Sequence, residues 1–331
     1  MLLNARHTLL LIMARFSPQE FRNGSMIPSV LQGRIDSSVS SLIKGTDSTP
    51  YGGGQYKRKP SFLMCPPKYL STAIPNNKFM KGQKIDTERA MRQYTRIKRL
   101  ITALGVKVIE LPPVKGAQDQ HFVANLGLSV DPFIFIAKMS ADGRQIEEEP
   151  GRRFFEKMGY TVLQPPHYWE GEAETKYWKD KTYFGGYGKF SDWRAQEWIS
   201  KKAGIEIIPM KMVSDDLYHL DCCIHVIDPE NFMVCRSGID SESFKRLEKL
   251  ANIIVVPKEM EATGATNLIR IPDKNIVISG MFQPEYHQYR KSMEWMLTTM
   301  DKFNNSVIFA DIDEADKNGA DCSCQVMHIT F

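Results

Sequence analysis

The feature that most constrains the fold is a pattern that recurs five times along the chain. Each copy consists of an amphipathic helix, a helix-stopping Gly or Asn, and a short apolar strand. The five stop residues are Gly105, Gly159, Gly204, Asn252 and Asn304. By subtraction, they lie 54, 45, 48 and 52 residues apart. A repeat near this length indicates modules arranged around an axis or along a solenoid.

The first copy shows how the elements are assigned. Apolar residues recur at three- and four-residue steps from Asp86 to Leu104, which predicts a helix capped by Asp86 and ended by Gly105. Val106 to Leu111 follows as a strand. Further strands are predicted at residues 61–65, 133–138, 182–184, 223–226, 276–278 and 325–329. Each module therefore reads strand, strand, helix, strand.

Five such modules favour an α/β fold in the form of a closed ring of five ββαβ blades around a central site. The alternative is an ordinary α/β sandwich in which the regular spacing arises by chance. In a ring, the loops near the axis converge, so residues far apart in the sequence can share one pocket.

Composition excludes several classes of protein. The 331 residues are 42% apolar and 25% charged, which is typical of a globular protein. Lys and Arg total 43 against 39 Asp and Glu, and a net charge of +4 does not indicate a nucleic-acid partner. The longest apolar run, residues 9–14, is far shorter than the roughly 20 residues that span a bilayer. Six cysteines in a chain of this length indicate reduced thiols in an intracellular protein.

The first part of the chain differs in composition from the rest. Residues 1–57 are rich in Ser and Gly and carry no acid before Glu20, whereas we expect residues 58–331 to form the folded domain that carries any functional site. Residues 1–57 could be a disordered extension or a mitochondrial presequence, and a secretory signal is a weaker alternative. Met26 is an alternative start. A cytoplasmic or mitochondrial location is therefore expected.

Three segments carry residues suited to catalysis, and each lies where a loop joins a strand. They are residues 169–174 with Glu170, residues 218–223 with His219, and residues 318–324 with Cys322. A Cys, a His and a carboxylate can form a nucleophile, a general acid/base and an orienting group. Taken singly, such residues are more often a solvated loop, a structural His and an inert core Cys.

Two other readings of local patterns are weak. His219, Cys222, Cys223 and His225 could suggest zinc, but strand alternation would place Cys222 on the face opposite the other three. Residues 185–188 are Gly-rich but lack the spacing and the Lys of a phosphate-binding loop, so a tight turn is expected.

Taken together, the three segments resemble those of the guanidine-modifying (pentein) superfamily, over about residues 61–331. This superfamily includes arginine deiminases, dimethylarginine dimethylaminohydrolases, arginine dihydrolases and amidinotransferases. Its members fold as a five-bladed α/β propeller and use a Glu-Gly loop, a His-Leu-Asp motif and a C-terminal Gly-x-x-Cys. The matching residues here are Glu170-Gly171, His219-Leu220-Asp221 and Gly319 to Cys322.

The resemblance implies a role for each matching residue. Cys322 corresponds to the nucleophile, His219 to the acid/base and Glu170 to its carboxylate partner, with no metal or organic cofactor. Asp221 corresponds to a second acid beside the substrate. Of Cys322 and Cys324, which we expect on the same side of a strand, motif position favours Cys322.

Three further matches resemble the arginine dihydrolase branch. Asn125, in Phe-Val-Ala-Asn, would face the guanidinium. Arg144 could hold the substrate carboxylate, and Asn77 matches the Asn of an Ile-Asn-Pro-Trp-Met segment. Deiminases and dimethylaminohydrolases usually carry Asp where Asn125 stands. A neutral Asn could tolerate a ureido intermediate, so a second hydrolysis to ornithine is a hypothesis.

The chain also departs from the family pattern. Ala173-Glu174 replaces a common Gly-Asp, Lys189-Phe190 lacks the usual Arg of the Gly-Tyr-Gly-x-Arg turn, and Asp321 precedes the cysteine. These departures bear on the substrate more than on the reaction class.

The sequence therefore predicts a thiol-dependent hydrolase of the guanidino group of arginine or an Nω-methylated arginine. Attack by the thiol would give a covalent thiouronium and release ammonia or an alkylamine, leaving citrulline or ornithine. The alternatives are an amidinotransferase and a non-catalytic propeller that serves as a binding module. The expected partner is a small guanidino substrate rather than nucleic acid or a membrane, and a homodimer is one option for the assembly.

Overall fold

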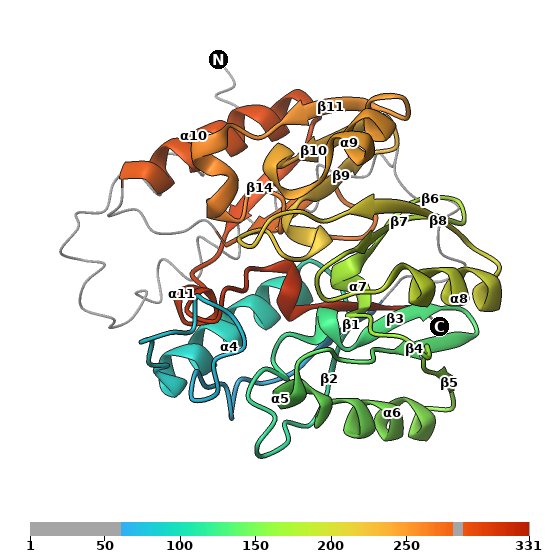
Figure 1. Cartoon of the computed structure of the whole chain (residues 1–331). Coiled ribbons are helices and arrows are strands. Elements are labelled where there is room, and N and C mark those ends of the chain that lie inside the picture. Colours follow the sequence, from blue (N-terminus) through green and yellow to red (C-terminus); the bar gives the residue numbers. More distant parts are fainter. Residues whose placement is uncertain (1–60, 281–286, 331) are drawn as a thin grey trace.

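The computed structural model describes residues 61–280 and 287–330 of the chain (Figure 1). The expected extension at residues 1–57 lies outside the described residues. Within the described ranges, no helix is both long and apolar enough to cross a membrane.

The described strands form five three-stranded sheets, each with the same local topology. In each sheet the central strand pairs antiparallel with one neighbour and parallel with the other, across a helical connection. Four units are continuous in the chain. The first consists of β3 (Gly127–Val130), β4 (Phe133–Ile136), α6 (Glu148–Lys157) and β5 (Thr161–Leu163). The second consists of β6 (Thr175–Lys179), β7 (Thr182–Tyr187), α8 (Trp193–Ala203) and β8 (Glu206–Lys211), and the third of β9 (Ile224–Asp228), β10 (Asn231–Val234), α9 (Ser241–Glu248) and β11 (Asn252–Val255). The fourth consists of β12 (Ile269–Arg270), β13 (Ile276–Ser279), α10 (His287–Lys302) and β14 (Ser306–Phe309).

The remaining sheet joins strands from opposite ends of the described chain. Strand β15 (Met327–Ile329) pairs antiparallel with β1 (Ser61–Met64), which pairs parallel with β2 (Val108–Glu110) after helix α4 (Thr87–Ala103). The predicted count of five ββαβ units is confirmed, and one unit is completed only by pairing the first strand with the last.

Helix boundaries follow the chemistry expected from the sequence. The Asp86 side chain accepts a hydrogen bond from the Arg89 N–H at 2.9 Å and caps α4, whose buried face includes Tyr94, Ile97 and Ile101. A residue with positive φ follows four of the five helices, at Gly105, Gly159, Gly204 and Asn304.

The predicted stop at Asn252 is wrong. Helix α9 ends at Glu248, and Asn252 is the first residue of β11. Its side chain donates to the Asn231 side chain of the neighbouring strand, so it belongs to the sheet rather than to a helix cap.

The apolar core connects the sheets in chain order. Buried residues of β1 and β15 pack with those of β4 and α6, those of β4 pack with α8 and β8, and a large cluster joins β7, β10 and β13. A fourth cluster joins β13 back to β1 and α4. Figure 1 shows the helices of the five units toward the outside of the molecule and the strands between them.

Short helices complete the chain, and four of them directly precede the first strand of a sheet. These four are η1 (Val123–Asn125), α7 (Gly171–Glu174), η2 (Leu220–Cys222) and η5 (Ser323–Gln325). The others are α5 (Asp142–Gln145), η3 (Arg236–Gly238), η4 (Lys258–Thr263) and α11 (Asp313–Asp316).

The pairing of β3 with β4 predicts a position that tolerates no side chain. A Cβ at Gly127 would lie 2.3 Å from the Phe135 carbonyl oxygen, so Gly127→Ala should lower the free energy of unfolding by about 1–3 kcal/mol. Urea unfolding measures this. Gly143→Ala is the control, because its Cβ would meet only Ile74 at 3.8 Å. Equal unfolding midpoints for both variants would contradict the close approach of the two strands.

Candidate active site

A cavity of about 40 Å³ collects residues from several sheets. Asn125 ends η1, Glu170 precedes α7, His219 precedes η2, and Cys324 lies in η5. All four line the cavity. The segments are far apart in the sequence, and the turn before each first strand carries its side chain to the same place.

Glu170 and His219 form a buried ion pair. The Glu170 Oε2 lies 2.8 Å from His219 Nε2, and the residues are 2% and 6% exposed. Burial alone would lower the pKa of His219, but its hydrogen bond to Glu170 and the nearby carboxylates raise that pKa overall. Burial alone would raise the pKa of Glu170, but His219 lowers it. Both groups are therefore held in their charged forms.

The loop that carries Glu170 requires a glycine next to it. Gly171 has a φ of +64°, and a Cβ there would lie 2.4 Å from the Ala124 carbonyl oxygen and 2.7 Å from the Asn125 carbonyl carbon. Only glycine accommodates both the left-handed backbone and this close approach. Gly171 thus allows α7 to pack against η1, which brings Glu170 beside Asn125.

Asn125 donates to Glu170 and lies next to His219. Its Nδ2 lies 3.3 Å from Glu170 Oε2 and 3.4 Å from His219 Nε2, and Asn125 is buried. The second carboxylate oxygen of Glu170 accepts from the Ser140 hydroxyl at 3.0 Å. The amide is neutral, so it adds no charge to the charged groups that it touches.

Arg144 lines the cavity but is already paired. Its Nε and Nη2 donate to the two carboxylate oxygens of Glu147 at 3.0 and 2.9 Å, and Nη2 also donates to the Asp119 and Phe122 carbonyl oxygens. Among the described residues, Nη1 has no hydrogen-bond partner. The expected carboxylate-binding role would therefore fall to Nη1 alone.

Asn77 also lines the cavity, where it shapes the wall. Its Nδ2 donates to the Asn318 carbonyl oxygen at 2.9 Å, and its Oδ1 accepts from the Phe79 and Met80 N–H groups. These bonds use both ends of the amide. Asn77 therefore joins two segments that are more than 200 residues apart.

Asp221 lies behind the cavity wall rather than in it. Its Oδ2 accepts from the Ser323 hydroxyl at 2.8 Å and lies 3.7 Å from the Cys324 sulfur. Its Oδ1 lies 3.5 Å from the Cys222 sulfur. Asp221 therefore contacts three side chains on η2 and η5 and is not among the residues that line the cavity.

The structure places the Cys322 side chain away from this cavity. Cys322 is fully buried in the apolar cluster that includes Phe62 and Ile278, and it does not line the cavity. The expectation placed Cys322 and Cys324 on the same side of a strand, whereas Ser323 to Gln325 form a 3₁₀ turn. With about three residues per turn, side chains two positions apart point in different directions.

Cys324 is the thiol that lines the cavity. Asn267 Nδ2 lies 3.4 Å from the Cys324 sulfur, and Asn267 Oδ1 accepts from the Ser323 N–H at 2.8 Å. Burial raises the pKa of Cys324 well above its usual value, and Asp221 raises it further. Among the described residues, no hydrogen bond joins Cys324 to His219.

Sequence reasoning missed several lining residues. Asn318 Oδ1 is a buried acceptor with no hydrogen-bond partner among the described residues, and Asn318 lines the cavity. Its Nδ2 donates to the buried Asp119 carboxylate at 2.9 Å. Phe190 and Tyr218 pack on the His219 ring, with centroids 5.4 and 4.8 Å away. Asn318 lay within the third segment, but its spacing gave no signal of this role.

The four residues of the weak zinc alternative are separated. His219 lines the cavity, the Cys223 sulfur lies 3.5 Å from the Leu217 carbonyl oxygen in the core, and His225 lines a different cavity. Cys222 contacts Asp221. In the described part of the chain, no three His, Cys, Asp or Glu side chains are grouped as potential metal ligands.

The ion pair predicts how His219 titrates. Its pKa lies above the ordinary 6.5, so the stabilisation from protonation is present below pH 6.5 and is lost as the pH rises through the raised value. The Glu170→Gln variant removes the main group that raises the His219 pKa, so burial, which lowers it, should dominate. We expect the titration midpoint of the His219 ring, followed by NMR, to fall below 6.5. Glu197→Gln, at an exposed position on α8, should leave that midpoint unchanged. An unchanged midpoint in Glu170→Gln would contradict the pairing.

Comparisons with known proteins identify the family and the fold. The family model described as "N,N dimethylarginine dimethylhydrolase, eukaryotic" matches residues 67–331. An uncharacterized protein of Caenorhabditis elegans is 26% identical over 270 residues, covering 81% of this chain and 92% of the relative. The bifunctional arginine dihydrolase/ornithine cyclodeaminase ArgZ of Synechocystis sp. is 29% identical over 221 residues, covering 64% of this chain and 31% of ArgZ. This chain thus spans about a third of that bifunctional relative.

Two solved structures share the fold. The N-terminal domain of ArgZ, covalently bound to a reaction intermediate, has a TM-score of 0.75 at 22% identity, covering 82% of this chain and 98% of that one. A dimethylarginine dimethylaminohydrolase adduct with S-methyl-L-thiocitrulline has a TM-score of 0.67 at 18% identity, covering 82% and 100%. The predicted resemblance to the pentein superfamily is confirmed, and the chain belongs to the eukaryotic N,N dimethylarginine dimethylhydrolase family.

Proposed function

We propose that the chain hydrolyses the guanidino group of arginine or an Nω-methylated arginine through a covalent intermediate on Cys324. The observation that carries the proposal is one cavity lined by a buried Glu170–His219 ion pair, the Asn125 amide and the Cys324 thiol. The reaction class, hydrolysis of a C–N bond in a linear amidine, follows the family. The family assignment favours hydrolysis over amidino transfer and over a non-catalytic role.

The thiol and the imidazole divide the chemistry. A bound guanidinium offsets the effect of burial, which raises the Cys324 pKa, so the thiol loses its proton to solvent water when substrate binds. The thiolate forms a bond to the guanidinium carbon, the C–N bond breaks, and protonated His219 gives a proton to the leaving amine. Neutral His219 then takes a proton from water, which adds to the thiouronium carbon. The adduct collapses as the C–S bond breaks, and its hydroxyl proton passes to the departing sulfur, which regenerates the thiol and releases citrulline.

Neighbouring groups suit the rest of an arginine-like substrate. The Glu170 carboxylate and the side-chain carbonyl oxygen of Asn125 would accept hydrogen bonds from the planar guanidinium, whose N–H groups match the geometry of a carboxylate. Arg144 Nη1 would bind the α-carboxylate. The unpartnered Asn318 Oδ1 and the Asp119 carboxylate would accept from the α-ammonium. Asp221 would act through Ser323 and Cys324 rather than by touching substrate.

The finer architecture is part of the same proposal. The five sheets would be the blades of an α/β propeller around this cavity, in a catalytic domain over residues 58–331. The shared cores between successive sheets, and between the last and the first, support this arrangement. The homodimer and the cytoplasmic or mitochondrial location remain predictions.

A product assay tests the assignment of the thiol. Purified protein would be incubated separately with arginine, monomethylarginine and asymmetric dimethylarginine, and citrulline, ornithine, ammonia and methylamines would be quantified. Cys324→Ser should lower turnover by roughly 1,000-fold or more, because it removes the nucleophile. Cys322→Ala should remain active although its core is less well packed. A folded but inactive Cys322→Ala together with an active Cys324→Ser would return the role to Cys322.

A second candidate, dihydrolysis of arginine to ornithine and two ammonia, is favoured by Asn125. A neutral amide beside Glu170 and His219 can hold a neutral ureido group, which a carboxylate at the same position would bind less well. Asn125→Asp should therefore lower the ratio of ornithine to citrulline by about 10-fold or more. An unchanged ratio would remove this role from Asn125. If the wild type forms only citrulline and dimethylamine from asymmetric dimethylarginine, and no ornithine from arginine, the first candidate, a single hydrolysis, is supported.

A further inference from the structure

A second and larger cavity, of about 130 Å³, takes no part in the proposed reaction. It lies back to back with the candidate active site: Ser323 lines this cavity and donates to Asp221, while Cys324 lines the other and contacts the same carboxylate. The same two segments line both cavities. One contributes Glu170 to the first cavity and Glu172 to the second, and the other contributes His219 to the first and His225 to the second. The volume can hold several waters or a small organic molecule.

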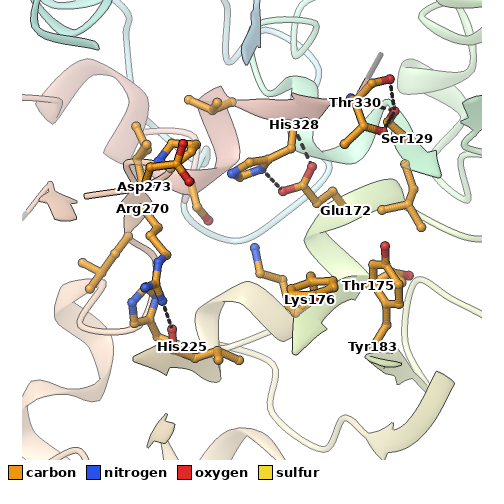
Figure 2. A pocket seen from close by; sticks show the side chains of 18 residues that line it. Ser129, Glu172, Thr175, Lys176, Tyr183, His225, Arg270, Asp273, His328 and Thr330 are labelled. Carbon is orange, nitrogen blue, oxygen red and sulfur yellow. Dashed lines mark hydrogen bonds and ion pairs between the residues drawn. The ribbon is translucent and has the colours of Figure 1, made fainter. Parts of the chain in front are cut away.

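Two cations extend into this cavity from different sheets. Figure 2 shows Lys176 reaching in from β6 and Arg270 from β12. Arg270 Nη1 is fixed by the Val226 and Ile227 carbonyl oxygens at 3.2 and 2.7 Å. Within the described residues, the Lys176 ammonium makes no hydrogen bond and no ion pair. A positive charge without a partner in a concave site is favourable to an anion.

A buried histidine lies beside the two cations. His225 is 7% exposed, lines the cavity, and makes no hydrogen bond among the described residues. Burial, Arg270 and Lys176 lower its pKa to about 3, so its ring is neutral at pH 7. Buried polar side chains in native proteins usually have a partner. His225 therefore offers an N–H that a ligand in the cavity could accept from.

The acids of the cavity set the charge of that ligand. Glu172 accepts from the His328 N–H at 2.8 Å and also pairs with the His328 ring. Asp273 adds a second carboxylate, at an exposed position. One added negative charge is tolerated better than two in such a site. Leu128, Val226, Leu268 and Val326 supply apolar walls.

We propose that this cavity binds a small monocarboxylate, with the carboxylate between Lys176, Arg270 and His225 and its short apolar body against the apolar walls. Guanidinium and ammonium groups both donate charge-assisted hydrogen bonds to a carboxylate. An alkyl chain gains free energy when it leaves water and packs against apolar walls. The site does not depend on the proposed reaction, because none of these residues lines the catalytic cavity.

Calorimetric titration of the full chain with sodium butyrate at constant ionic strength tests the proposal. Butyrate should bind to the wild type, and Lys176→Met should weaken binding by about 10-fold or more. Lys179→Met is the control: this lysine is on the same strand, exposed, and lies over the Trp178 ring. Because Lys176 lies in the second cavity only, its effect separates this site from carboxylate binding at Arg144.

Three outcomes would overturn the proposal. Equal binding of butyrate to the wild type and to folded Lys176→Met would place the carboxylate elsewhere. Equal binding of n-butanol would make the cavity apolar without anion preference, and tighter binding of inorganic phosphate would make it a site for a multivalent anion. As an independent measurement, the His225 ring resonances of the wild type should shift on addition of butyrate, and unshifted resonances with bound butyrate would also contradict the site.

Discussion

The candidate site depends on one buried ion pair. Glu170 and His219 are almost completely withdrawn from water, and a buried charge is costly unless it is paired and fully hydrogen-bonded. Two side chains meet this requirement, because Ser140 and Asn125 donate to the Glu170 carboxylate. The Glu170 backbone N–H donates to the Ser191 hydroxyl, which holds the backbone in place. Loss of any one segment would leave a charge uncompensated, so the ion pair and the packing of the segments support each other.

Further acids that do not line the cavity of the candidate site contribute to its electrostatics. Burial raises the pKa of both Glu147 and Glu174 to about 7, although Arg144 opposes the shift at Glu147 and His219 opposes it at Glu174. Burial and the neighbouring cations therefore shift the pKa of each of these carboxyls in opposite directions. A cation in the cavity would favour the ionised carboxylates, and these would in turn favour the cation. This balance suits the proposed guanidinium substrate.

Backbone geometry explains which side chains reach the cavity. Glu170 and His219 precede their short helices with non-helical φ and ψ, whereas Cys322, at the corresponding place before η5, has helical values of −61° and −51°. Equal spacing from the following strand therefore does not give equal direction. In the last unit the side chain at the cavity is Cys324, two residues later.

The sequence alone determined what depends on neighbours along the chain. Helix caps, stop residues and the apolar periodicity of α4 are local, and they predicted five ββαβ units with an error only at Asn252. The chemical kinds of residue at the site were also readable, because Glu170, His219 and Asn125 stand in recognisable segments. Only the tertiary structure placed the Cys324 side chain, and not that of Cys322, at the cavity, paired Arg144 with Glu147, and placed Asp221 against Ser323 and Cys324. Those outcomes depend on contacts between residues far apart in the sequence. Such contacts fix where each side chain points, and local sequence patterns do not contain that information.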